Sequence, residues 1–592
     1  MGIALIDSYH KRAPLQVQTV HKINSVKEID DLTAVCEKVS TEKILGILLK
    51  SLQNGSTEVQ AKTAEIIAEL AKTENCRVSC VEEGLVPILV EKMDTDKAPV
   101  ALQACRALGN ICYEYDGGRM CVISSGGSEK LLNLLKRAAE IPNTPENHQL
   151  RLVATGFLLN LLNSYDSSED HPLDTMLIDV LCHYLEKFAI DEDIPTHILL
   201  SLSCLADSES SRELVISKNI TPYLVNILNC NESAEVVETC LELITNLAET
   251  DCVKTQFASG KICEAVIGVI NRHIKTPSPD LSPPIIKTAT DLLVLILVGD
   301  ESMLLLYNNG EGEVYKELVN WLSSNLEDLQ IAGALAVGNF ARNDSHCIKM
   351  VNQNIGQQLL QVLSGHNSQE GDIRLQHALL SALRNLSIAK ENKPIIVKQG
   401  ALETLLPMIS TIETYPVVFK LLATLRMIID GQLEAAIKLG QSEESISKIV
   451  AWSKAFEHPG VQGEASRILA WIIKNCDDNE KVHESLLKLG SLSPLITMLS
   501  SEHVIMVNEA TLALALMFRK LKISSFIEEL KTSSFMFSTI SILKNQSIPP
   551  EVIVNVLSSL LVLSSSVMIS LMSFLGYLLI GEWCKRLDKI LV

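Results

Sequence analysis

Aromatic side chains are scarce in this chain of 592 residues, since Phe, Trp and Tyr together make up 4% of it. β-Sandwiches and barrels depend on aromatic and β-branched strands, so this shortage disfavours an all-β protein. The 47% of hydrophobic residues consists mainly of Leu, Ile, Val and Ala, which suits stacked helices. The length exceeds the size at which one core keeps growing, and it predicts several domains or a repeat array.

Basic residues are also in short supply, with 51 Lys and Arg against 71 Asp and Glu and a net charge of −20. Binding to a phosphate backbone depends on cations that displace counterions, so a nucleic-acid partner is disfavoured. The acidic excess predicts a basic partner instead.

Paired cysteines are missing. The 15 Cys lie singly between Cys36 and Cys584 without a C-x-x-C spacing, which argues against a zinc site or a disulfide framework. They are typical of small buried hydrophobic residues in a reducing compartment. The N-terminal apolar run is too short for a signal peptide, and Ile6 occupies the place of the Ser or Thr of a myristoylation motif. We therefore expect a cytosolic protein.

Motifs of covalent catalysis are missing as well, including the phosphate-binding loop, the nucleophile elbow, the H-E-x-x-H metal motif and the kinase set. The acidic "GEGE" at Gly310 to Glu313 is interpreted as a loop. His346, His377 and His503 are isolated, and isolated histidines usually lie at a helix edge. The sequence predicts no enzyme, no cofactor and no metal.

One pattern recurs along the chain as a ladder of similar apolar helices. Its clearest members are centred on Asn residues, and weaker members fill the gaps between them, at steps of 41 to 50 residues. The twelve centres are Glu69, Asn110, Asn160, Cys204, Asn246, Ile296, Asn339, Asn385, Met427, Trp471, Ala515 and Ser559. This period is that of HEAT and armadillo repeats, and it predicts an all-α, right-handed armadillo superhelix of about twelve repeats with a concave groove.

Each repeat is expected to contain two shorter helices joined by a Gly turn, and then a longer helix that carries the ladder residue. Gly84, Gly400 and Gly490 supply that turn. We expect an N-terminal segment over residues 1–40, the array over 41–550 and a divergent terminal repeat or cap over 551–592.

The ladder amides have two interpretations. Asn339, at the edge of an apolar stripe in "GALAVGNFARND", and Asn385 either bond the backbone of the neighbouring repeat or face the groove and bind a partner. Their recurrence favours a row that lines the groove. Asn343 lies four residues after Asn339, and we expect it to point the same way.

An acidic stripe is predicted in "SAEVVETCLELITNLAET". Glu235, Glu238, Glu242, Asn246 and Glu249 are separated by steps of three or four residues, which places them on one side of a helix. Such a stripe is usually a solvated face. The ladder residue Asn246 within it places these acids on the groove side, where we expect them to bind a basic partner.

Six strings are longer and more idiosyncratic than a general repeat pattern requires: "RALGNICYEYDGGR" (106–119), "LVGDESM" (297–303), "AGALAVGNFARND" (332–344), "HALLSALRNLSIAKENK" (377–393), "FKLLATLRMIIDGQLEAA" (419–436) and "SEHVIMVNEATLALAL" (501–516). They resemble the small G protein GDP dissociation stimulator (SmgGDS) family, and the likeness runs from about Ala61 to Leu516.

The resemblance implies a monomeric armadillo protein that binds Rho-, Rap- or Ras-type small GTPases with basic, prenylated tails. It also implies that the protein stimulates GDP release, acts as a chaperone of these GTPases, or does both. The residues expected to bind the partner are Glu238, Glu242, Asn246, Glu249, Asn339, Asn343, Arg384, Asn385, Arg426, Asn508 and Glu509. For Arg384 and Arg426, a structural role in ion pairs is an equal alternative.

The stretch from Val552 to Gly581 contains no charged residue and is long enough to span a bilayer. We interpret it as the last ladder helix followed by an atypical cap. The alternative is a tail anchor, which would place the chain at endoplasmic-reticulum or mitochondrial membranes.

A rival function is that of an importin-like or catenin-like adaptor for other basic peptides. Import receptors of this fold place a Trp four residues before each groove Asn. Here only Trp471 and Asn475 have that spacing, so clamping of a cargo peptide is disfavoured.

Overall fold

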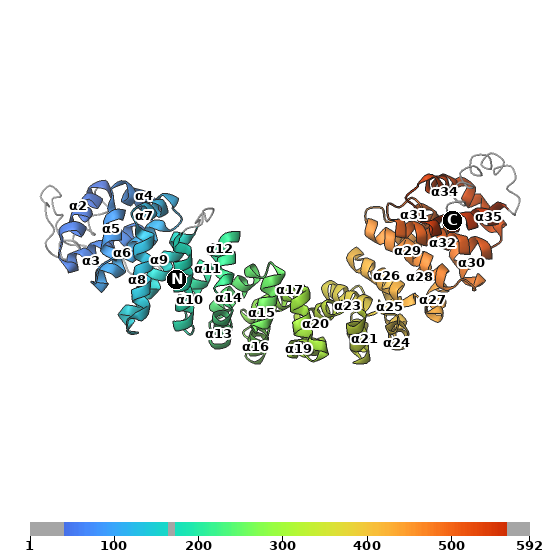
Figure 1. Ribbon diagram of the computed structural model, residues 1–592, viewed down its shortest axis with the longest axis horizontal. Helices are drawn as coiled ribbons and strands as arrows, with labels where there is room; N and C mark the ends of the chain where they lie inside the picture. Colours follow the sequence, from blue (N-terminus) through green and yellow to red (C-terminus); the bar gives the residue numbers. More distant parts are fainter. Residues whose placement is uncertain (1–40, 164–171, 565–592) are drawn as a thin grey trace. The chain divides into compact units, whose positions relative to one another are not determined.

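The computed structural model describes residues 41–163 and 172–564. The secondary structure of these residues is α-helical, with the short 3-10 helices η2 (Asn308–Gly310), η3 (Trp321–Ser323) and η4 (Ile523–Ser525), and none of them lies in a strand. The chain divides into two compact units, unit 1 up to Ser302 and unit 2 from Met303. Figure 1 shows how helices of successive repeats follow one another within each unit.

A layer of long third helices runs through each unit, and each of these helices contacts the next one of its unit. In unit 1 they are α3 (Thr57–Leu70), α6 (Ala98–Cys112), α9 (Pro145–Leu162), α11 (Ile194–Ala206), α14 (Ala234–Leu247) and α17 (Ser282–Ile296). In unit 2 they are α20 (Glu327–Phe340), α23 (Ile373–Leu386), α26 (Tyr415–Ile429), α29 (Pro459–Asn475), α32 (Val504–Lys520) and α35 (Pro550–Ser564). All twelve predicted ladder centres lie in these helices, which confirms the repeat assignment.

First and second helices, most of them shorter, precede the third helices. The first helices are α4 (Glu74–Glu82), α7 (Asp116–Ser124), α12 (Glu209–Ser217), α15 (Asp251–Ser259), α18 (Asp300–Tyr307), α21 (Asp344–Asn352), α24 (Asn392–Lys398), α27 (Leu433–Gly440), α30 (Glu480–Lys488) and α33 (Ile527–Thr532). The second helices of unit 1 are α2 (Thr41–Asn54), α5 (Leu85–Met93), α8 (Gly127–Glu140), α10 (Pro172–Lys187), α13 (Thr221–Cys230) and α16 (Ile262–Lys275). Those of unit 2 are α19 (Glu313–Asn320), α22 (Ile355–Ser364), α25 (Ala401–Thr411), α28 (Glu443–Trp452), α31 (Leu492–Met498) and α34 (Phe535–Lys544).

The predicted turn between first and second helices is present. Gly84, Gly400 and Gly490 have φ values of 72°, 96° and 86°, in the left-handed region that glycine enters without steric cost. Lys261 and Asn354 take the same conformation in two other repeats. The turn therefore reverses the chain within a few residues, so that both short helices pack against the third.

The core consists of aliphatic side chains between neighbouring third helices. Leu379 and Leu383 in α23 are fully buried, and burial of one Leu side chain contributes about 1.5–3 kcal/mol. Small residues let these helices approach closely. A Cβ added at Gly109 would lie 3.3 Å from the Cα of Phe157 in the next third helix, closer than most such contacts.

The carboxyl ends of several third helices are capped by a polar side chain six residues further on. Each cap donates a hydrogen bond to a backbone carbonyl that would otherwise lack a partner within the helix. The pairs are Arg77 with Ala71, Arg212 with Ala206, Ser302 with Ile296, His346 with Phe340 and Asn392 with Leu386. His346 is therefore a structural histidine of this cap.

The stretch "GALAVGNFARND" is not one helix. Helix α20 ends at Phe340, and Asn343 is the N-cap of α21, where its side-chain oxygen accepts a hydrogen bond from the backbone N–H of His346 at 2.9 Å. The expectation that Asn343 points the same way as Asn339 from a shared helix is therefore wrong. Asn is favoured at an N-cap because its short side chain reaches the free N–H groups of the first turn.

Buried His483 is expected to make stability depend on pH. Its side chain is fully buried in α30, and burial lowers the pKa of His483 below its usual value of 6.5. A lowered pKa means that folding favours the neutral ring, so stability is present above about pH 6.5 and is lost as the pH falls toward the folded-state pKa. His483→Phe is expected to reduce the loss of melting temperature between about pH 7.5 and pH 5.5. Substitution of the exposed His503 by Gln should leave that loss unchanged, and an equal loss in both variants would contradict the assignment.

Helix α35 is the last described element, and it contacts α32 as a twelfth ladder helix. The expected N-terminal segment 1–40 and the apolar stretch from 565 to 581 lie outside the described residues. Among the residues that the structure does describe, no helix is long and apolar enough to cross a membrane.

Candidate functional site

The solvent-exposed side of the third helices, called the third-helix face below, carries most of the candidate residues. On this face the ladder amides of α6, α9 and α23 each donate a hydrogen bond to a backbone carbonyl of the preceding third helix. The bonds join Asn110 to Ala68 (2.8 Å), Asn160 to Gly109 (3.1 Å) and Asn385 to Gly338 (3.0 Å). The amide nitrogens of these three residues therefore tie neighbouring repeats together.

The other ladder amides differ. Asn339 donates to Leu335 of its own helix at 3.1 Å, and its side-chain oxygen accepts from Arg342 at 3.3 Å. Asn246 in α14 is exposed, and within the described residues its side chain makes no hydrogen bond. Asn246 is thus the ladder amide with both its donor and its acceptor available to a partner.

Helix α14 carries the predicted acidic stripe. Glu235, Glu242 and Asn246 are exposed and Glu238 is half-buried, whereas Glu249 lies two residues beyond the end of the helix. Glu249 forms an ion pair with Arg212 of α12. No cation of the described chain lies within 4.0 Å of Glu238 or Glu242, so these carboxylates are available to a basic ligand.

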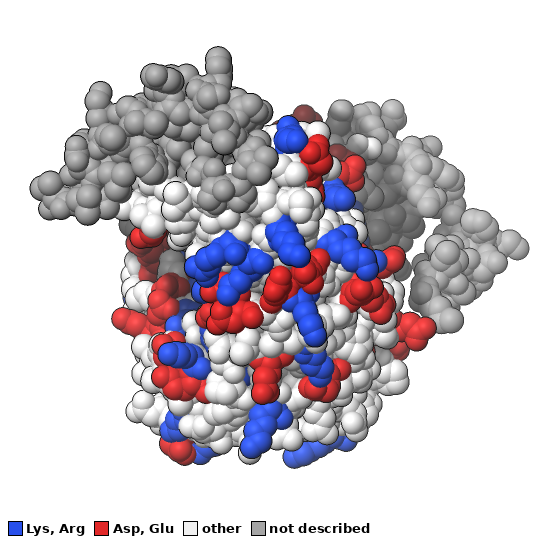
Figure 2. All heavy atoms as spheres, turned by 90° about the vertical axis from the view of Figure 1, so that its right-hand side faces the viewer, with Lys and Arg blue, Asp and Glu red and all other residues white. Residues whose placement is uncertain are grey.

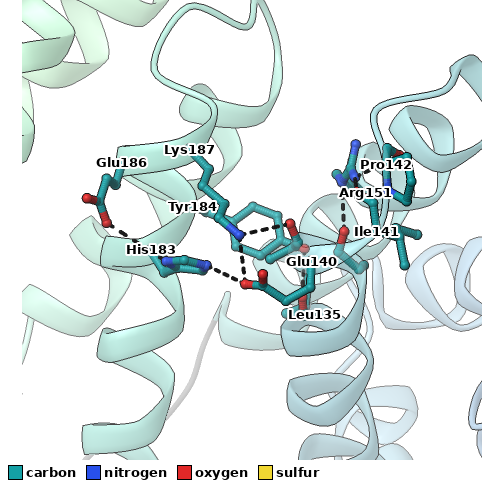
Figure 3. Close-up of polar contacts among 11 residues, drawn as sticks. Leu135, Glu140, Ile141, Pro142, Arg151, His183, Tyr184, Glu186 and Lys187 are labelled. Atoms are coloured by element: carbon teal, nitrogen blue, oxygen red, sulfur yellow. Dashed lines mark hydrogen bonds and ion pairs between the residues drawn. The ribbon is translucent and has the colours of Figure 1, made fainter.

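Glu140 of unit 1, by contrast, is paired with basic side chains of its own unit (Figure 3). Its Oε1 accepts from Lys187 Nζ at 2.7 Å and from His183 Nε2 at 2.9 Å, and the bond from Lys187 is the main cause that lowers the pKa of Glu140. These contacts join α8 to α10. The Tyr184 hydroxyl of α10 adds a further link, because it donates a hydrogen bond to the Leu135 carbonyl of α8. Glu140 therefore has its partners within the protein, whereas Glu238 and Glu242 have no cationic partner in the described chain.

Charges on one face of the molecule are similarly mixed. On the side of the molecule that faces the viewer in Figure 2, basic and acidic side chains alternate instead of forming a patch of one sign. Exposed ion pairs of unit 2, such as Arg519 with Asp477 and Lys520 with Asp478, are of this kind. Glu238 and Glu242 of α14 differ from these paired carboxylates, because no cation of the described chain lies within 4.0 Å of either.

Arg426 is buried in a network of ion pairs on three successive third helices. It donates to Glu464 through Nε at 2.9 Å and Nη2 at 3.2 Å, and Arg467 also donates to Glu464 at 2.8 Å. Arg467 in turn donates to both oxygens of Glu509, at 2.8 and 2.7 Å. Arg426 is 4% exposed, so this network takes the structural role that was one of its two alternatives.

Glu464 and Arg467 were not among the sequence-based candidates. The signal for them was present in the sequence, because they lie three residues apart in α29 and one repeat away from Arg426 and Glu509. Asn508, beside Glu509, accepts a hydrogen bond from Asn555 of α35 at 3.2 Å. Both predicted residues of α32 therefore also contribute to contacts between repeats.

Arg384 stands apart from that network. It is half-buried in α23, and its one hydrogen bond within the described chain runs to the side-chain oxygen of Asn385 at 3.3 Å. No carboxylate of the described chain lies within 4.0 Å of it. The ion-pair alternative therefore does not apply to Arg384, and its charge remains available to a partner.

The pair Trp471 and Asn475 has the import-receptor spacing but is engaged within the protein. Asn475 donates to the Trp471 carbonyl at 2.7 Å and accepts from the Gly431 N–H at 2.7 Å. The Trp471 ring already has Lys474 at 4.2 Å and Arg426 at 5.4 Å from its centre. Neither the amide nor the ring is prepared for a basic cargo peptide, which agrees with the sequence-based argument against an importin-like clamp.

The comparisons with known proteins agree with the resemblance seen in the sequence. The chain is 37% identical over 484 residues to Rap1 GTPase-GDP dissociation stimulator 1-A of Xenopus laevis, covering 82% of this chain and 79% of that protein. It is 33% identical over 542 residues to the GTPase-GDP dissociation stimulator vimar of Drosophila melanogaster, covering 84% of each. The chain belongs to the family of GTPase-GDP dissociation stimulators. The resemblance inferred from the six strings is thereby confirmed.

The comparison with solved structures concerns the fold alone. A chain from the work "A conserved phosphorylation switch controls the interaction between cadherin and beta-catenin in vitro and in vivo" superposes with a TM-score of 0.57 at 16% identity. The match covers 88% of this family member and 99% of that chain. It supports the armadillo fold predicted from the repeat period. No protein-family model matches the sequence.

Proposed function

We propose that the protein binds small GTPases of the Rho, Rap or Ras type through their basic, prenylated C-terminal tails and stimulates the release of GDP. An escort role for the prenylated GTPases is compatible with the same surface. We also propose that it acts as a monomer in the cytosol. The observation that carries the proposal is the pair of carboxylates Glu238 and Glu242, which lie without cationic partners on the third-helix face of α14.

The chemistry of a basic tail fits this surface. Glu238 and Glu242 lie one turn apart, about 6 Å along the helix axis, which is close to the spacing of alternate Lys or Arg side chains on one side of an extended tail. Asn246, one turn further, offers an amide to the backbone of the tail. The net charge of −20 adds a long-range attraction that speeds the encounter with a basic partner.

Stimulated GDP release requires no covalent step by this chain. A partner that binds the nucleotide-free GTPase more tightly than the GDP-bound form shifts the population toward release, and that difference in affinity limits the shift. Each tenfold preference corresponds to about 1.4 kcal/mol. The protein is therefore proposed as a regulator whose binding energy changes the conformation of the GTPase.

The deciding experiment measures the release of fluorescent GDP from Rho-, Rap- and Ras-type GTPases with the full chain present or absent. Each GTPase is tested with its basic tail, without it, and in prenylated form. We expect faster release from at least one GTPase and a smaller acceleration after removal of its tail. The absence of both acceleration and complex formation with all of them would refute the proposal. Formation of complexes without faster GDP release would refute stimulated release and support the escort role only.

A further inference from the structure

A second charged surface lies on the third-helix face of unit 2 and has the opposite sign. It consists of Arg384 and His377 on α23 and Lys420 on α26, and it is called the basic cluster below. All three side chains are half-buried. Arg384 and Lys420 are the permanent charges at neutral pH, and the His377 ring supplies an N–H donor.

A hydroxyl bridge between the two helices fixes the position of the cluster. Thr424 Oγ1 lies 2.9 Å from the carbonyl oxygen of Leu380 in α23 and 2.7 Å from that of Lys420 in its own helix. Lys420 therefore lies beside Leu380, which is three residues after His377 and four residues before Arg384. The two residues of α23 thus flank the level of Lys420, one turn on either side.

The pKa values are consistent with that proximity. Burial, and after it the charge of Arg384, lowers the pKa of Lys420. Burial, and after it the charge of Lys420, lowers the pKa of His377. The basic groups thus repel one another in the free protein, and a bound anion would relieve that repulsion.

The cluster lacks carboxylate partners, unlike other cations on third helices of unit 2. Within the described ranges, no Asp or Glu oxygen lies within 4.0 Å of its three residues. Other cations of this layer are paired with acids: Arg374 with Asp328 and Asp372, Arg426 with Glu464, Arg467 with Glu464 and Glu509, and Lys474 with Asp430. The basic cluster thus has no acidic partner in the described chain, although the sequence contains 71 acidic residues.

We propose that the basic cluster binds the carboxylates of an acidic segment on a protein partner. The partner would be the GTPase, and in this respect the inference rests on the proposed function. His377 and Arg384 are seven positions apart in α23, which is about 10 Å along the helix, and adjacent helix axes are about 8–10 Å apart. Cations spread over that width match several carboxylates of a segment better than one small anion. Nucleic acid is disfavoured by the net charge of −20.

The test uses the full-length double variant Arg384→Gln/Lys420→Met and two ligands, a fluorescein-labelled polyglutamate peptide and a GTPase with its basic tail. We expect the variant to bind each ligand about tenfold more weakly than the unchanged protein at low salt, because the charge-assisted contacts of both cations are lost. Binding of the peptide by the unchanged protein should weaken as salt is added. The conservative variant Arg384→Lys/Lys420→Arg should retain most of the affinity and shows that the site still folds.

The matched control is Lys390→Met/Lys398→Gln, which removes the same charge from two exposed residues. Lys390 precedes α24 and Lys398 is its last residue. Equal losses in both double variants would mean a general effect of charge and would overturn the proposal. So would unchanged affinity of Arg384→Gln/Lys420→Met for both ligands, or displacement of the peptide by inorganic phosphate alone. Cluster-dependent peptide binding without any GTPase complex would keep the acidic-segment site and refute the proposed function.

Discussion

Reversal of Glu238 and Glu242 to Lys is expected to weaken binding of a GTPase with a basic tail by about tenfold or more, and to reduce the acceleration of GDP release accordingly. One exposed ion pair contributes about 0.2–1 kcal/mol, and a reversal replaces attraction by repulsion at two positions. The combined change therefore reaches about 1–3 kcal/mol. Titration with a fluorescent-GDP-loaded GTPase at two salt concentrations measures it, and the loss should shrink as salt screens the charges.

The double variant should melt at the same temperature as the unchanged protein or slightly higher. Repulsion between like charges one turn apart costs a few tenths of a kcal/mol, and the two introduced lysines would be as close to each other as the original acids. A loss of binding without a loss of stability would therefore report on the partner.

The control Glu213→Lys/Glu264→Lys changes the net charge equally, at exposed positions of the first helix α12 and the second helix α16. If this control weakens binding as much as the reversal in α14, the effect is one of overall charge and the acidic stripe is not the binding surface. Unchanged binding in the α14 variant would exclude Glu238 and Glu242 directly. A tail-deleted GTPase should respond to neither variant.

The repeat architecture was predictable because it depends on periodic burial. Each of the twelve ladder centres lies on a third helix, since an apolar stripe at a fixed period requires neighbours that cover it. The Gly turns were equally predictable, because a left-handed residue at a helix end favours glycine. What a single sequence could not give is the point at which a helix stops. Asn343 lies four residues after Asn339, the spacing of one helical turn, yet it caps the next helix, α21.

The roles of individual polar residues were harder to predict, because they depend on the register between neighbouring third helices. Asn385 reaches a carbonyl 47 residues earlier, whereas Asn339 bonds within its own helix. Arg384 and Arg426 had the same two alternatives from the sequence, and the structure separates them because Arg426 is buried beside Glu464 whereas Arg384 has no carboxylate of the described chain nearby. Sequence reasoning could propose the acidic stripe because all of its members lie on one helix or just after it. It could not find the basic cluster, which combines residues of two repeats.

Arg426→Met is expected to lower the stability of unit 2 by about 2–4 kcal/mol while leaving GTPase affinity unchanged once the protein is folded. Removal of the guanidinium leaves Glu464, which is 8% exposed, with one cation instead of two, and a buried carboxylate without full compensation is costly. Urea denaturation followed by tryptophan fluorescence measures the loss, and Trp471 is a local probe because Arg426 lies 5.4 Å from its ring centre.

A second substitution separates the cost of an uncompensated charge from the cost of lost packing. In Arg426→Met/Glu464→Leu the buried charge disappears with its partner, and apolar replacements of similar size often restore stability. Arg467 keeps its two bonds to Glu509 in that variant. We therefore expect the double variant to recover most of the loss. Should the double variant be less stable than Arg426→Met alone, the network would stabilise unit 2 through its ion pairs. Should Arg426→Met instead reduce GTPase affinity at full folding, Arg426 would belong to the binding surface with Arg384.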